Sequence, residues 1–392
     1  MNDVTRQFRD FFVSLKLTIV LLALSIILIF AATLDQVNLG IWAVQQKYFH
    51  SLFVLWRVGD IPVPVFPGGY LIGGFLLVNL ISAQVYRFKF TAKKSGIWLT
   101  HVGLIILLIG ELLTGLWQEE FALRLDEGQS KNYSESYRFN ELAITETTDA
   151  AFDDVVVIPE KILARGEAIQ HAKLPFRVVL KIYFPNAALA SRDEPATGAP
   201  PAPATPATKG IGLQATATPL PLTYKQDERN APAAYVELVG AEGSLGTWLV
   251  SADPRFPPQR FDYAGRTWKI AFRFERSYKP FSLTLLKFSN DLYPGTDIPK
   301  NYSSRIRLNT PDGRDDREVL IYMNNPLRYA GLTFYQASFD GPKTTILQVV
   351  RNPSWLLPYI ACALMTLGLL VQFGIHLVAF IARRRQAASA AV

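Results

Sequence analysis

Two of the four histidines in this sequence lie in apolar surroundings, where an imidazole is best placed to do chemistry. His101 lies in "WLTHVGLIILLIG" and His376 in "VQFGIHLVAF". An ionisable residue in such a run is costly and therefore indicates a function. A neutral imidazole there can be an axial haem ligand, part of a proton relay or one ligand of another metal. The alternative is a helix-end histidine that hydrogen-bonds a neighbouring carbonyl or reaches the membrane interface.

The supply of ligands in the chain favours haem over other metals. Zinc requires about four ligands, and the sequence contains no Cys and His cluster of suitable spacing. Cys362 is the single cysteine, which excludes an internal disulfide, a CxxC redox pair and a CxxCH haem-attachment motif. Haem needs only one or two axial ligands. His50 and His171 stand alone in polar surroundings, and we interpret both as surface residues.

Four apolar segments must position the two buried histidines. They cover residues 15–34, 70–86, 97–117 and 355–380, each close to the roughly 20 residues that span a bilayer as a helix. His101 and His376 both fall near the inner ends of their helices, so we expect them at a similar depth. Gly103 and Gly110 form a stripe on which another helix can pack closely. His101 lies about 200° of helix rotation from Gly103 and therefore faces elsewhere.

Basic residues in the short flanks predict the orientation of these helices. Lys and Arg precede the first helix, fill the connection 87–94 and follow the fourth helix at 383–385. Both termini are therefore expected in the cytoplasm, and the roughly 235 residues between Trp117 and Trp355 outside. A cleaved signal peptide is the alternative for the first segment, but its apolar run is too long. The net charge of +7 arises largely from these flanks, which removes the argument for nucleic acid.

The fold class expected is an integral membrane protein with four transmembrane α-helices and a large extracytoplasmic all-β domain, an antiparallel sandwich or partial barrel. Residues 1–117 form a three-helix membrane region, 118–354 the β domain, and 355–392 the fourth helix with a basic tail. Residues 41–55 predict an amphipathic helix on the outer membrane surface, followed by extended backbone at Pro62, Pro64 and Pro67. The Ala- and Pro-rich residues 196–219 predict a disordered insertion.

The strands of the β domain are expected in nine short runs of alternating or β-branched residues. The run 321–340 indicates a strand, an Asn-Pro turn and a second strand. Its aromatic residues Tyr329, Phe334 and Tyr335 are core residues in the simpler interpretation and an exposed contact patch in the alternative. The predicted strands cover residues 120–125, 155–158, 176–184, 234–240, 268–274, 282–288, 303–308, 318–324 and 333–339.

Motifs spread along the whole chain resemble the ResB family, also called CcsB, of cytochrome c biogenesis. They are "SLKLTIVLLAL", "QQKYFHSLFVLW", "VPVFPGGYL", Asn79, "HVGLIILLIG", "LYPGTDIPKNYSSRIRL" and "YMNNPLRYAGLTFYQ". The Ala- and Pro-rich insertion has no counterpart in this pattern.

The resemblance implies a subunit of the bacterial inner membrane that works with a CcsA or ResC partner. Together they carry haem b, as transient cargo, across the membrane and join it to apocytochrome c outside, alongside thiol-reducing biogenesis factors. A histidine in this membrane helix is a haem ligand in the family, and the matching position is His101. His376 is a further hypothesis for the second ligand within this chain. The resemblance implies a subunit of a synthase complex rather than a stand-alone enzyme.

Two interpretations from other classes remain open. A membrane-anchored receptor or envelope assembly protein could bind a polypeptide through the outer domain without a cofactor. A proton-coupled transporter fits less well, because the helices carry few ionisable groups and no inverted repeat is visible.

Overall fold

The protein divides into two compact units. A computed structural model describes residues 3–59, 61–149, 152–191, 206–223, 230–296 and 299–390. One unit joins Met1–Glu119 to Arg351–Val392, and the other contains Glu120–Thr223 and Asp227–Val350. The boundaries expected after residues 117 and 354 lie close to this division.

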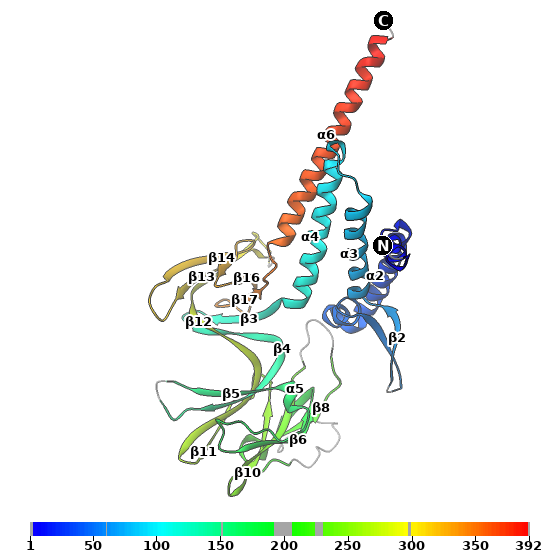
Figure 1. Ribbon diagram of the computed structural model, residues 1–392. Helices are drawn as coiled ribbons and strands as arrows, with labels where there is room; N and C mark the ends of the chain where they lie inside the picture. Colours follow the sequence, from blue (N-terminus) through cyan, green and yellow to red (C-terminus); the bar gives the residue numbers. More distant parts are fainter. Residues whose placement is uncertain are drawn as a thin grey trace. The chain divides into compact units, whose positions relative to one another are not determined.

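The first unit is mainly helical, and its described residues include four helices that are long and apolar enough to cross a membrane (Figure 1). They arise where the sequence carries its four apolar runs. A π-helical turn extends two of them, at Gln45–Phe49 and Ala83–Arg87. The helices of this unit are α1 (Asp3–Phe12), α2 (Leu15–Val44), α3 (Gly69–Ser82), α4 (Ser95–Trp117) and α6 (Leu357–Ala390).

The connection from α2 to α3 corrects one prediction. The helix kinks at Gly40, whose positive φ of 71° suits glycine, and then continues through Phe49. The amphipathic helix expected over 41–55 ends there, because β1 (Phe53–Val58) pairs with β2 (Ile61–Pro67) as a hairpin. The prolines of β2 do give extended backbone, as expected. A two-stranded ribbon tolerates them because each strand has one unpaired edge.

The second unit is an antiparallel β domain. One sheet has ten strands in the order β14-β13-β12-β4-β3-β17-β16-β15, with β11 beside β12 and β5 beside β4. A second sheet has the order β10-β9-β6, and β7 pairs with β8. The elements are β3 (Glu119–Asp126), β4 (Ser130–Glu146), β5 (Asp154–Pro159), α5 (Glu160–Leu163), β6 (Arg177–Phe184), β7 (Ala187–Ser191), β8 (Ala215–Pro219), β9 (Ala233–Gly240), β10 (Gly243–Ser251), β11 (Gln259–Tyr263), β12 (Arg266–Leu292), β13 (Pro299–Asn309), β14 (Asp316–Tyr322), β15 (Leu327–Tyr329), β16 (Leu332–Phe339) and β17 (Thr344–Arg351).

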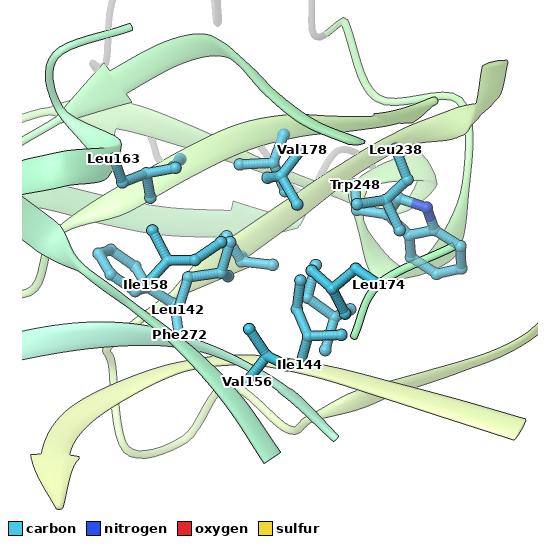
Figure 2. Packing of buried hydrophobic residues seen from close by; sticks show 14 of the residues in the cluster. Leu142, Ile144, Val156, Ile158, Leu163, Leu174, Val178, Leu238, Trp248 and Phe272 are labelled. Carbon is cyan, nitrogen blue, oxygen red and sulfur yellow. The ribbon is translucent and has the colours of Figure 1, made fainter. Parts of the chain in front are cut away.

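Two of the apolar cores in this domain make it partly a sandwich and partly barrel-like. In the first, side chains from β4, β5 and β12 face those from β6, β9 and β10, as Figure 2 shows for Leu142, Val178 and Trp248. In the second, the large sheet curls so that β14 lies against β15 and β16 around Phe334 and Ile321. The prediction of a sandwich or partial barrel is confirmed, and Phe334 is a core residue rather than part of an exposed patch.

One long strand, β12, belongs to both cores. The sequence predicts two strands at 268–274 and 282–288, and the structure joins them without a turn. Its first half pairs with β4 and its second half with β13. The pairing with β4 breaks between Tyr278 and Leu283, so the polar residues between the predicted strands form a bulge rather than a loop.

The predicted disordered insertion at 196–219 is wrong for its second half. Residues 196–205 lie outside the described residues, whereas residues 206–219 include a 3-10 turn (Gly210–Leu213) and strand β8. Ala217 is fully buried, and its backbone N–H donates to the Tyr235 hydroxyl at 3.1 Å. The alanines of this segment pack against the large side chains of Tyr235 and Leu249. Composition alone does not reveal such partners.

Candidate functional site

The helix that carries His101 is held by α6 along a stripe of glycines. Gly96, Gly103 and Gly110 are buried on α4. A Cβ on Gly103 would lie 2.7 Å from Met365 Cγ, and one on Gly96 would lie 2.5 Å from the Gly368 carbonyl oxygen. The predicted close approach of another helix is therefore confirmed. The physical reason is that glycine alone lets the two backbones come this near.

We predict that Gly103→Leu separates α4 from α6. The added side chain meets Met365 and the Ala361 carbonyl, and such overpacking costs about 1–3 kcal/mol. Thermal melting of the detergent-purified protein should show a lower midpoint. Gly74→Leu on α3 is the matched control, because no atom lies within 4 Å of its built Cβ. An equal change in both variants would contradict the role of the stripe.

The His101 ring is half-buried and oriented by its own helix. Its Nδ1 lies 2.8 Å from the Ile97 carbonyl oxygen. Because a carbonyl only accepts, Nδ1 carries the proton and Nε2 keeps a free lone pair. This is the contact expected of a helix-end histidine, and it is also the one that fixes the tautomer of a metal-binding histidine. The residues present therefore fit one axial ligand of haem iron.

His376 lies at a different level, which corrects the expectation of similar depth. Gln372, one turn before His376, packs against Gly96, while Met365 packs against Gly103. His376 is therefore roughly ten residues, or about 15 Å, from the level of His101 along the antiparallel helix pair. Its Nε2 lies 2.9 Å from Gln372 Nε2. The two rings therefore lie at different levels of the helix pair, and the haem-ligand role of His376 stays a hypothesis.

His50 has a more defined setting than its sequence context indicates. Its ring stacks on Tyr70, with centroids 5.6 Å apart, and its Nδ1 lies 3.1 Å from Gln46 Nε2. A Cβ on Gly115 of α4 would lie 3.5 Å from His50 Nε2. His50 also lines a cavity of about 360 Å³ together with the kinked end of α2. In the sequence, His50 was marked only by its place between the first two apolar segments. Its stacking on Tyr70 depends on tertiary contacts.

Asn79, a residue of the family pattern, anchors α3 to the junction between α1 and α2. It is 3% exposed, and its Nδ2 donates to the carbonyls of Phe12 at 2.7 Å and Ser14 at 3.2 Å. The Thr18 hydroxyl donates to Asn79 Oδ1 at 2.6 Å. These bonds satisfy the backbone at the break between α1 and α2, so Asn79 holds helices together rather than performing chemistry.

The other sequence-level candidates are placed apart from His101. His171 is exposed and its Nδ1 accepts from the Lys173 backbone N–H at 3.2 Å, which is a turn contact. Cys362 is exposed on α6. Within the described ranges, no group of three or more His, Cys, Asp or Glu side chains could hold a metal ion.

Comparison with known proteins agrees with the β-domain motifs. The model of the ResB-like family matches residues 264–346, which include β12 to β16. The chain is similar to this family over that segment. Over 92 residues it is 41% identical to Protein NrfI of Wolinella succinogenes, covering 23% of this chain and 10% of that protein.

Two further relatives are named for cytochrome c biogenesis. Over 85 residues the chain is 33% identical to the cytochrome c biogenesis protein CcsB of Picosynechococcus, covering 22% of the chain and 18% of the relative. It is 35% identical over 77 residues to CcsB of a Synechococcus strain, covering 20% and 17%. The chain thus matches less than a fifth of the length of these relatives.

Proposed function

We propose that this chain is a membrane subunit of a cytochrome c biogenesis complex. The similarity to two proteins named for cytochrome c biogenesis carries this proposal, and the ResB-like segment supports it. The finer proposal is that the complex moves haem from the cytoplasmic side to the outer side and presents it for covalent attachment to apocytochrome c. A CcsA- or ResC-like membrane protein is the partner.

The surface of the helical unit supports its insertion in a membrane. Large apolar side chains are exposed on the helices, among them Ile26 at 69%, Phe30 at 65% and Phe373 at 70%. Exposed apolar surface of this extent favours contact with lipid or with another membrane helix. The basic flanks then favour cytoplasmic termini and an outer β domain.

His101 is the residue that binds haem iron in this proposal. Its Nε2 is free to donate a lone pair to the iron of the haem in transit, and the Nδ1 contact with Ile97 holds the ring in one orientation. A histidine of the partner supplies the second axial ligand. The helix pair α4 and α6 fixes the position of the ring, because the glycine stripe leaves little freedom between them.

Deletion of the gene in its host tests the proposed function. We expect c-type cytochromes to lose covalently bound haem, seen as lost haem staining after denaturing electrophoresis, while apocytochrome persists. A plasmid copy of the full chain should restore the staining. Unchanged staining in the deletion strain would overturn the proposal. The cofactor-free alternative predicts that the chain purified with its partner shows no Soret absorption.

A further inference from the structure

A cavity lined by both polar and apolar residues lies where β12 breaks its pairing with β4. Tyr278 lies opposite Tyr133, but the next paired residue, Leu283, lies opposite Lys131. Four residues of β12 therefore bulge against one of β4. Pro280 is among them, and it has no backbone N–H to continue the ladder. Bulges of this kind redirect side chains and are frequent beside functional sites.

Lys279, within the bulge, is a buried cation with neutral hydrogen-bond acceptors. It is 8% exposed, and its Nζ donates to Ser134 Oγ at 2.6 Å and to the Ser277 carbonyl at 2.9 Å. Both acceptors are neutral, and an ammonium has three hydrogens to donate. The carboxylates of Glu141 and Glu135, on the facing strand β4, pair with Arg273 and Arg276 instead. Burial lowers the pKa of Lys279 to about 8, as expected for an uncompensated charge.

The surroundings of the cavity carry more positive than negative charge. Lys131 also lines it, donates to the Arg124 carbonyl at 2.8 Å, and has its pKa lowered, chiefly by burial. The nearby Glu135 accepts from Arg276 Nε at 3.0 Å. Arg276 in turn lies 4.0 Å from the centre of the Tyr133 ring. Asp126 also acts on Lys131, and it accepts from the Thr344 hydroxyl at 2.6 Å. Both carboxylates are therefore engaged, and two lysines remain to attract an anion.

The shape and lining of the cavity define the chemical class of that anion. Its volume is about 350 Å³, and Pro280, Phe281 and Pro311 form apolar walls beside the two lysines. Inorganic phosphate would use the charge but not these walls. A carboxylate attached to an apolar body uses both, because burial of the body adds to the charge-assisted hydrogen bonds.

We propose that the cavity at the β12 bulge binds the carboxylate of an apolar organic acid through Lys279 and Lys131. The propionate of haem is one such group, and naming it as the physiological source rests on the proposed function. A small aromatic or aliphatic acid is the other source. The site itself does not depend on His101, because it lies in the β unit.

Calorimetric titration of the full chain in detergent with benzoate tests the site. An anion favours the protonated lysine, so the pKa of Lys279 rises on binding and protons are taken up near pH 8. Uptake, measured in two buffers of different ionisation enthalpy, should vanish near pH 6, where Lys279 is already protonated. Saturable binding with pH-dependent uptake supports the proposal. Absence of benzoate binding, or binding without proton uptake at pH 8, overturns it.

Substitutions separate the site from general charge effects. Lys279→Met should weaken benzoate binding at least about tenfold and raise the melting temperature, because a buried charge is removed. Lys131→Met should also weaken binding. Lys287→Met, an exposed lysine of the same strand, should leave it unchanged. Equal binding by Lys279→Met and the native chain would overturn the proposal.

Porphyrins distinguish the two sources of the carboxylate. Zinc protoporphyrin should displace benzoate if the haem propionate is the ligand, and its dimethyl ester should not. If neither porphyrin displaces benzoate, the ligand of the site is a small organic acid and not haem. Because the measurement does not use cytochrome yield, its failure can be told apart from a failure of the proposed function.

Discussion

His101→Gly should remove most of the haem that co-purifies with this chain and its membrane partner. Loss of a hydrogen bond that only orients a metal ligand costs roughly 10- to 100-fold in affinity, and this substitution removes the ligand itself. The Soret absorption per complex and the pyridine haemochrome content should both fall by at least about tenfold. Cytochrome c yield should fall in parallel.

Two controls separate ligation from structural damage. Exogenous imidazole should refill the space left by the His101 ring and restore the spectrum. His376→Gly should retain haem, because its Nε2 contacts Gln372 and lies at another level of the helix pair. Unchanged haem content in His101→Gly would contradict the ligand role, and equal losses in both variants would point to helix packing instead.

Arg273→Met should destabilise the β domain by about 3–5 kcal/mol, because it leaves a buried carboxylate unpaired. Arg273 and Glu141 lie directly opposite on β12 and β4. Their side chains are 17% and 4% exposed, and Arg273 Nε donates to Glu141 Oε1 at 3.0 Å. Pulse proteolysis of the full chain in urea measures the loss.

The control for this pair lies on the same two strands. Arg266 pairs with Glu146 at 2.9 Å but is 53% exposed, so Arg266→Met should cost no more than about 1 kcal/mol. The double variant Arg273→Met with Glu141→Leu should recover most of the stability, since no buried charge remains. Equal losses for Arg273→Met and Arg266→Met would contradict the argument.

The pH dependence of the Arg273→Met variant follows from Glu141. Burial is the largest effect on this carboxyl and already raises its pKa. Without Arg273, the pKa rises further. A carboxyl with a raised folded-state pKa binds more protons folded than unfolded, so the free energy of unfolding increases as pH falls. The loss of unfolding free energy in Arg273→Met, relative to the native chain, should therefore be smaller at lower pH.

The β domain shows which strands local sequence patterns predict and which they miss. The runs at 120–125 and 303–308 became strands β3 and β13, because alternation of apolar and polar residues is a local property. Strand β4 was not predicted, since "SKNYSESYRFNEL" is largely polar and becomes a strand through its neighbours β12 and β3. The ordered structure of residues 206–219, in which Ala217 is fully buried, was missed for the same reason.

By itself the sequence determined the four apolar helices, the glycine stripe and the presence of a histidine in an apolar run, because hydropathy and helix periodicity depend on residues close together in the chain. Only the tertiary structure decided that α6 covers this stripe, that His376 lies at another level, and that Lys279 sits beside Lys131 at a bulge. These are contacts between residues more than a hundred positions apart, and they depend on register and packing, which no local pattern encodes.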